Sequence, residues 1–335
     1  MPQELTHIQL FLTAFGLVLI LTAITGVFGL KLLRKLQVGQ TVREDGPHTH
    51  FIKSGTPTFG GLFFLLPLTL VMLLLAFRYE DMRQLVSLLL LTLSFALTGF
   101  LDDLIKTRIN RKGLSVRQKS VLLFLLAFAF GFYYLYLAPQ PAFIRIPVSG
   151  QQIDLQGWIR LPYLIFVMLY LFFMSNSVNL TDGVDGLASS VTLLNALALA
   201  LIGRSLLSAI PAALPAYAFS LAIAAGCLGF LIFNRHPARV FMGDTGSQAL
   251  GAAVAGTALI LGMPWLMLLT GMIYIIESFS VIIQVAYFKK TGGRRIFRMS
   301  PIHHHFELGG WKENKIVLIF SLVTLAGCLA AWLLI

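Results

Sequence analysis

The feature of this sequence that most limits its fold is a series of long apolar runs. A helix that crosses a membrane needs about 20 mostly apolar residues. Charged residues make up only 12% of the 335-residue chain, about half of their share in a soluble domain. We therefore expect a single domain over residues 1–335, an all-α polytopic membrane protein with about ten spans. The ten runs are 8–30, 59–77, 85–101, 120–137, 161–178, 187–202, 212–233, 247–261, 265–288 and 316–335.

The basic residues predict how these runs are oriented. The loops after the odd-numbered runs hold 20 of the 25 Lys and Arg residues, and the loops after the even-numbered runs hold the other five. Because basic residues collect in cytoplasmic loops, the odd-numbered loops should be cytoplasmic and both termini should lie outside, in the periplasm or extracellular space. The net charge of +11 therefore fits a membrane surface and phosphorylated substrates, and it needs no nucleic-acid partner.

Two stretches depart from simple spanning helices. The ninth run contains Glu277 and Gln284, so we expect a bend or a break in it. Glu277 is the one acidic residue within a run, and we expect it to find a partner inside the bundle. In the outside loop 138–160, two short runs flank Ser149-Gly150, which predicts a small β-hairpin.

Aspartates gather where runs meet the predicted cytoplasmic face. Carboxylates this close to hydrocarbon are costly, so they are candidates for function. Asp102 and Asp103 are adjacent, and adjacent helical residues point about 100° apart. One of them is therefore free to act on a metal and the other on a substrate. The five aspartates of this group are Asp102, Asp103, Asp182, Asp185 and Asp244.

Two of the loops between runs are rich in oxygen ligands. Asn176, Asn179, Asp182 and Asp185 lie in one loop without a basic residue, and hard oxygen ligands suit Mg²⁺. Asp182 and Asp185 share a face if their segment is helical. In the other loop, Gly-Asp-Thr-Gly-Ser precedes an apolar run and could bind an anion or a metal through Asp244. Phe241 could stack on a base or anchor the chain at the membrane interface.

Two further loops carry residues that suit phosphate. Consecutive histidines rarely supply three ligands to one zinc ion, so His303, His304 and His305 fit phosphate binding or proton transfer better. Lys53 and Thr58 precede the second run in a glycine-rich segment. Its lysine and hydroxyls can meet a phosphate, although the order of a P-loop is missing.

Five segments together resemble the bacterial phospho-N-acetylmuramoyl-pentapeptide transferases, a branch of the polyprenyl-phosphate N-acetylaminosugar-1-phosphate transferases. Phe59 and Val184 stand where this family would lead us to expect Met and Leu, and both are apolar exchanges. The segments are GTPTFGG (55–61), FLDDLIK (100–106), NSVNLTDGVDGLA (176–188), FNRHPARVFMGDTGS (233–247) and PIHHHFELGGWKE (301–313).

The resemblance implies a reaction, a cofactor and roles for residues. UDP-N-acetylmuramoyl-pentapeptide would give its phospho-sugar to undecaprenyl phosphate, yielding lipid I and UMP for peptidoglycan synthesis, at the cytoplasmic face of the bacterial inner membrane. The enzyme would require Mg²⁺, bound by Asp244, and would form a homodimer. Asp102, Asp103 and His303 would be catalytic. Substrate-binding residues would be Lys53, Thr58, Lys119, Asn176, Asn179, Asp182, Gly183, Asp185, Phe241, Gln284, His304 and His305.

Several alternatives stay open at this point. Attack by the lipid phosphate could be direct, which we favour, or an aspartate could first form a covalent phospho-enzyme. A related transferase that uses another UDP-aminosugar is the nearest rival. A transporter would predict charges in the middle of spans and inverted repeats, whereas the acidic residues here collect at one predicted face.

Overall fold

A bundle of long helices dominates the structure, a computed structural model that describes residues 6–36, 55–82, 84–110 and 112–335. Each predicted apolar run lies on a helix, which confirms the mostly helical, polytopic fold. The principal helices are α2 (Val18–Lys35), α3 (Leu62–Arg78), α4 (Leu85–Arg108), α5 (Val116–Phe132), α6 (Arg160–Thr181), α7 (Leu187–Ser205), α8 (Ala213–Asn234), α9 (Gly243–Ile260), α11 (Met272–Lys290) and α13 (Glu313–Trp332).

Short elements extend or join these helices. The shorter helical elements are α1 (His7–Leu10), η1 (Phe11–Leu17), η3 (Glu80–Met82), η4 (Tyr133–Leu137), η5 (Gly157–Ile159), α10 (Leu266–Thr270) and α12 (Ile302–Glu307). The ninth run is broken, as expected, but the break is at Gly271, between α10 and α11. Glu277 and Gln284 both lie within the unbroken α11.

Within the described residues, eight helices are long and apolar enough to cross a membrane. Helix α3 is shorter, and α9 is rich in Gly, Ala, Ser and Thr. The number of crossings and their sidedness therefore stay predictions. Leu70, Leu74 and Phe77 on α3 are exposed, as expected for side chains that face lipid rather than water.

Helix α9 lies at the centre of the bundle. Its residues from Thr245 to Ile260 are all buried, and it packs against α4 and α6. Small residues let helix backbones approach closely in a membrane, where the hydrophobic effect does not drive helices together. The sequence of α9 therefore suits a central position, although it is less apolar than its neighbours.

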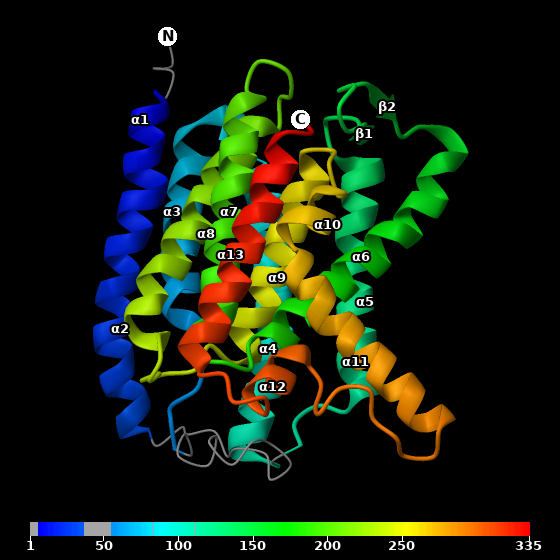
Figure 1. Ribbon diagram of the computed structural model, residues 1–335. Coiled ribbons are helices and arrows are strands. Elements are labelled where there is room, and N and C mark those ends of the chain that lie inside the picture. Colours follow the sequence, from blue (N-terminus) through cyan, green and yellow to red (C-terminus); the bar gives the residue numbers. More distant parts are fainter. Residues whose placement is uncertain (1–5, 37–54, 83, 111) are drawn as a thin grey trace.

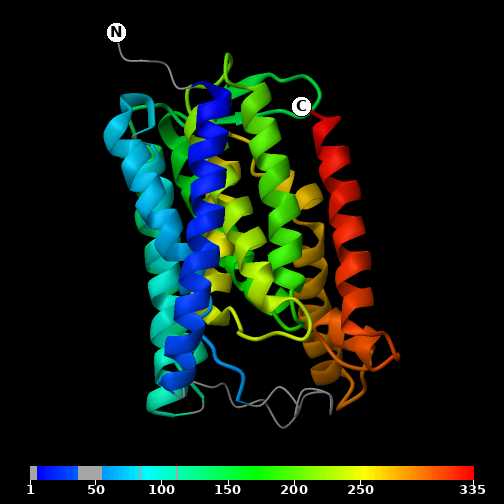
Figure 2. The same cartoon turned by 90° about the vertical axis from the view of Figure 1, so that its left-hand side faces the viewer.

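The predicted β-hairpin is present. Strands β1 (Phe143–Arg145) and β2 (Gln152–Asp154) pair antiparallel, with Ile144 opposite Ile153. The hairpin, the start of α1 and the end of α13 lie at one end of the bundle, and α12 lies at the other (Figure 1). Figure 2 shows the same separation from the side. This arrangement agrees with termini on one side of a membrane and a site on the other.

Candidate active site

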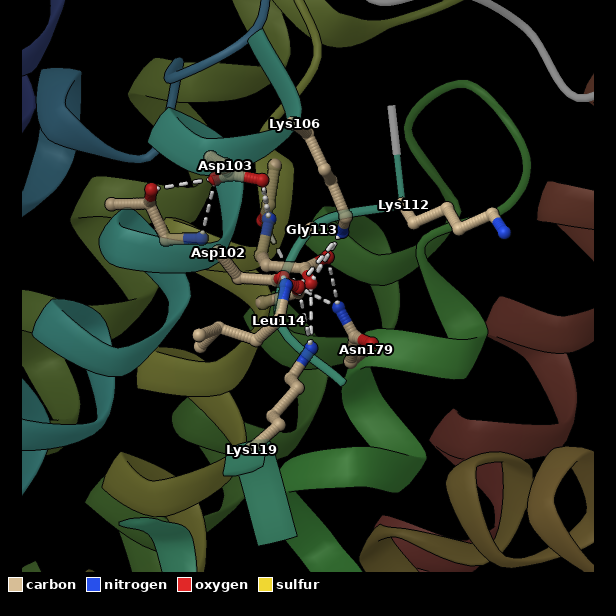
Figure 3. A network of polar contacts seen from close by, with 12 residues as sticks. Asp102, Asp103, Lys106, Lys112, Gly113, Leu114, Lys119 and Asn179 are labelled. Carbon is tan, nitrogen blue, oxygen red and sulfur yellow. Dashed lines mark hydrogen bonds and ion pairs between the residues drawn. The ribbon is translucent and has the colours of Figure 1, made fainter. Parts of the chain in front are cut away.

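Helix ends from four parts of the chain meet at the end of the bundle that carries α12. Helix α4 brings Asp102, Asp103 and Lys106, α5 brings Lys119, α6 brings Asn179 and α9 brings Asp244. Figure 3 shows the side chains of Asp102, Lys106, Lys119 and Asn179 converging on one point, with Asp103 directed to other partners. We call Asp102, Asp103, Asp244, Lys106 and Lys119 the carboxylate–lysine cluster.

Asp244 is at the centre of this cluster. Its Oδ2 atom lies 2.6 Å from Lys119 Nζ and 2.9 Å from Lys106 Nζ. Its Oδ1 atom accepts a hydrogen bond of 2.8 Å from Asn179 Nδ2. The same amide nitrogen donates to Ser247 Oγ at 2.8 Å, and Ser247 Oγ donates to the carbonyl of Gly243. Since the Ser247 hydroxyl proton is used on Gly243, Asn179 must present its nitrogen, which fixes the orientation of its amide.

The two adjacent aspartates point to different partners. Asp102 Oδ2 lies 2.9 Å from Lys106 Nζ and 3.3 Å from Lys119 Nζ, and its Oδ1 accepts from the Leu114 amide. Asp103 instead turns to the start of α9 and accepts from the backbone amides of Asp244 and Thr245. These amides have no partner within their own helix, so Asp103 caps α9 from a neighbouring helix.

The backbones of α4 and α9 touch beside the cluster. A Cβ atom built on Gly99 would overlap the carbonyl group of Asp244. Glycine at position 99 therefore permits the close approach that places Asp102 and Asp103 next to Asp244.

Lys106 is a site residue that the sequence reasoning missed, because it was counted only as a basic loop residue. The structure places it in the last turns of α4, where it contacts both Asp102 and Asp244. The signal was present: Lys106 follows Asp102 by four residues, and residues at that spacing lie on one face of a helix.

A second polar group is buried where α11 meets α12. His303 Nδ1 lies 3.0 Å from Glu277 Oε1, and both side chains are fully buried. This pair confirms the expected partner for Glu277 inside the bundle. Glu277 Oε2 and His303 Nε2 have no hydrogen-bond partner among the described residues. The His303 Nε2 atom is directed at Gly183, where a Cβ would overlap it.

Asp185 lies in a third polar group, at the start of α7. Its Oδ2 atom lies 3.1 Å from His236 Nδ1 and accepts from the Ala238 amide at 3.0 Å. Glu313 approaches the same histidine at 3.5 Å, so the three side chains could hold a metal ion.

Asp182 is the residue that directly follows α6. The segment from Asp182 to Asp185 is a turn, so the helical spacing considered for this pair does not apply.

The remaining predicted residues surround these groups or support nearby loops. Gln284 binds the backbone of Ile296 and Phe297 through three hydrogen bonds. Asn176 donates to the carbonyl of Phe172 in its own helix. Thr58 is buried and, like Asp103, lies against Gly243.

The histidines after His303 bond to nearby residues of the chain, whereas the loop around Phe241 bonds to a distant loop. His304 Nδ1 lies 2.6 Å from Glu307 Oε2, and His305 Nδ1 accepts from the Arg298 amide. The Phe241 backbone pairs with Pro57 and Gly60, which joins the loop before α3 to the loop before α9. Lys53 lies outside the described residues.

The donor set of the carboxylate–lysine cluster fits a hard divalent cation. Carboxylate oxygens are the ligands that Mg²⁺ prefers in proteins, usually with several waters and substrate phosphates. Asp102 and Asp244 offer such oxygens next to two ammonium groups. The same ammonium groups suit phosphate oxygens. The cluster can therefore gather a metal and phosphate groups at one point.

Comparison with known proteins gives a consistent result. The family model of glycosyl transferase family 4 matches residues 85–262. A protein of Acetivibrio thermocellus is 44% identical over 326 residues, which cover 96% of this chain and 93% of the relative. A protein of Carboxydothermus hydrogenoformans is 47% identical, covering 88% of this chain and 89% of the relative. One of Listeria innocua is 40% identical, covering 96% and 97%. All three are named phospho-N-acetylmuramoyl-pentapeptide-transferase.

Proposed function

Because this chain belongs to the phospho-N-acetylmuramoyl-pentapeptide-transferases of glycosyl transferase family 4, we propose that it catalyses the reaction for which they are named. It transfers phospho-N-acetylmuramoyl-pentapeptide from the UDP conjugate to undecaprenyl phosphate, giving lipid I and UMP in peptidoglycan synthesis. The chain is a multi-pass protein of the bacterial inner membrane, consistent with its eight candidate spans. The observation that carries the proposal is the convergence of Asp102, Asp244, Lys106 and Lys119 at one end of the bundle.

Asp244 is the proposed ligand of Mg²⁺, with Asp102 beside it. Both carboxylates contact the same two ammonium groups, so Asp102 could assist Asp244 in holding a cation. When bound, the metal neutralises phosphate oxygens and so reduces the repulsion between two anionic substrates.

The lysines of the cluster bind the phosphates of both substrates. Lys119 and Lys106 reach the cluster from separate helices, α5 and α4. Positioning and neutralising charge account for most catalysis in phosphoryl transfer, where proteins supply little covalent chemistry. His303 contacts the phosphates from its buried position beside Gly183.

Transfer is direct in this proposal. An oxygen of the lipid phosphate attacks the phosphorus that carries the sugar. The bond from that phosphorus to the oxygen bridging to UMP breaks, and UMP leaves with the electron pair. A terminal phosphate is largely a dianion near pH 7, because its second pKa is about 6, so attack needs little help from a base. Asp103 is held by α9, with hydrogen bonds of 3.1, 2.9 and 2.7 Å, which argues against it as a free nucleophile.

The nucleoside and sugar occupy the surface around the cluster. Phe241 stacks on the uracil base, and Asp182, Asp185 and Asn176 supply polar contacts from the ends of α6 and α7. Lys53, Thr58, Asn179, Gly183, Gln284, His304 and His305 complete the proposed binding surface. We also propose that the protein works as a homodimer, as the resemblance implies.

The test is UMP release by purified protein from UDP-N-acetylmuramoyl-pentapeptide and undecaprenyl phosphate, with and without Mg²⁺. Asp244→Ala should lower the rate by at least about 100-fold, because it removes the charge that holds the metal. Asp154→Ala is the matched control, since Asp154 is an exposed aspartate of the hairpin at the opposite end of the bundle. Release from a different UDP-aminosugar only would assign another substrate. No release from any UDP-aminosugar by folded protein would overturn the proposal.

A further inference from the structure

The carboxylate–lysine cluster raises a question of charge that the proposed function leaves open. Two carboxylates, Asp102 and Asp244, contact two ammonium groups, and a third, Asp103, accepts from the backbone amide of Asp244. The cluster therefore has a formal charge of −1 without a metal, and a divalent cation would bring it to +1. Two lysines already contact one oxygen of Asp244, the proposed ligand of that cation.

The other oxygen of Asp244 accepts a hydrogen bond. Its Oδ1 atom accepts from Asn179 Nδ2, and Ser247 holds the Asn179 amide in that orientation. Oδ1 keeps a second lone pair, but it belongs to the same carboxylate as Oδ2, which contacts both ammonium groups. A cation held by either oxygen of Asp244 would therefore lie close to both lysines.

Three cations at one carboxylate would repel one another. Lys119 Nζ and Lys106 Nζ lie 2.6 and 2.9 Å from Asp244 Oδ2, so a divalent ion there would be a few ångströms from both. Repulsion between charges at such distances is large at a partly buried site. One ammonium group must move when the metal binds.

The structure indicates which lysine moves. Lys106 has the more exposed side chain, 25% against 16% for Lys119. It also lies one turn from Asp102 on α4 and contacts Asp102 Oδ2 at 2.9 Å, so it can leave Asp244 without losing its other partner. Lys119 makes its shortest contact with Asp244 itself.

We propose that Lys106 is an exchangeable counter-ion of Asp244, which gives up this carboxylate to the divalent cation and becomes free to bind substrate phosphate. After the exchange the cation faces one ammonium group at Asp244 instead of two. It also releases an ammonium group at the point where the anionic substrate arrives. This inference rests on the proposed function for two points only: that the cation is Mg²⁺, and that the phosphate belongs to the substrate.

Metal affinity, measured without substrate, tests the exchange independently of activity. Mn²⁺ serves as the probe, because free Mn²⁺ is counted by electron paramagnetic resonance in detergent solution. Lys106→Met removes the competing charge and should tighten Mn²⁺ binding on the order of tenfold. Lys106→Arg keeps the charge and should leave the affinity near that of the natural protein. Lys112→Met removes a charge from the loop that follows α4, but the Lys112 side chain points away from the carboxylates (Figure 3), so it should change little.

The outcomes separate this inference from the proposed function. Tighter binding in Lys106→Met alone, together with slower UMP release, is the expected result. In a second outcome the natural protein binds Mn²⁺, Asp244→Ala abolishes this binding, and folded Lys106→Met binds Mn²⁺ no more tightly than the natural protein. That outcome would overturn the exchange and leave the metal site intact. If Lys112→Met tightened Mn²⁺ binding as much as Lys106→Met, the loss of any nearby positive charge would explain the effect. That result would also overturn the exchange. Failure of the natural protein to bind Mn²⁺ would overturn both proposals. A melting curve of each variant in the same detergent confirms that it is folded.

Discussion

Asp103 accepts two hydrogen bonds from Thr245, one from the backbone amide at 2.9 Å and one from the hydroxyl at 2.7 Å. The two residues belong to α4 and α9, the helices that bring the aspartates of the site together. Asp103 thus acts on the geometry of the site through a helix end, whereas Asp102 faces the lysines directly.

We therefore expect Asp103→Asn to destabilise the fold as well as slow the reaction. The asparagine must direct its NH₂ group at an amide hydrogen of α9, and an unsatisfied buried group costs about 1–3 kcal/mol. Thr245→Val removes only the hydroxyl bond and should cost about 1 kcal/mol. Thermal unfolding in detergent measures both variants. Equal melting temperatures for Asp103→Asn and the natural protein would contradict this role.

The buried pair of Glu277 and His303 gives a second prediction. Glu277→Ala or His303→Ala should each cost about 3 kcal/mol, because each leaves the other polar group buried without its partner. The double variant should cost clearly less than the sum, since no partner is then left unpaired. The free energies of unfolding of the natural protein, the two single variants and the double variant give the coupling energy between Glu277 and His303. His305→Ala is a control, because His305 bonds to a backbone amide at an exposed position. Strictly additive losses would refute the coupling.

Gly183 and His303 give a third prediction, for activity. An alanine at position 183 would place its Cβ against the His303 Nε2 atom and displace the imidazole. A displacement of about 1 Å can lower a rate by about 100-fold, so UMP release by Gly183→Ala should fall to that extent. Gly16→Ala is the matched control, because a Cβ at Gly16 meets nothing within 4 Å. Full activity of Gly183→Ala would show that the position of His303 is unimportant.

Gln284 gives a fourth prediction, for loop dynamics. Its side chain accepts from the amides of Ile296 and Phe297 and donates to the Phe297 carbonyl. Gln284→Leu has a similar shape but makes none of these bonds. Hydrogen exchange at Ile296 and Phe297 should then accelerate, by about tenfold if about 1.4 kcal/mol of local protection is lost. Amides within α9 are the internal reference and should not change. Unaltered exchange at both loop amides would rule out this support.

Much of the fold could be predicted from the sequence, because a helix that crosses a membrane needs a long run of mostly apolar residues. Helix boundaries were less accurate, for identifiable reasons. Helix α9 begins at Gly243, four residues before the apolar run starts at Ser247, where Asp103 caps it from another helix. Helix α4 continues past the apolar run, which ends at Leu101, as far as Arg108. Hydropathy reports the part of a helix in lipid, not where its hydrogen bonds end.

The break in the ninth run was expected for a reason that does not hold. Glu277 and Gln284 suggested it, but both stay within α11 because each finds partners beyond its own helix. His303, the partner of Glu277, lies in a later segment of the chain, and no pattern within the ninth run predicts this pair. For the site, the aspartates could be selected from their place at helix ends. Lys106 could have been selected too, from its spacing to Asp102, but its contact with Asp244 could not, because Asp244 is 138 residues away in the chain.

The contact between Gly99 and Asp244 has a consequence for genetics. Gly99 has no functional group, yet any side chain at this position would push the carbonyl of Asp244 away and separate α4 from α9. Each replacement would therefore misplace three aspartates at once. In a saturation screen that selects for growth, we expect position 99 to tolerate as few residues as Asp244 does. Second-site mutations that restore growth to the Gly99 variants should then introduce smaller side chains where α4 and α9 are in contact.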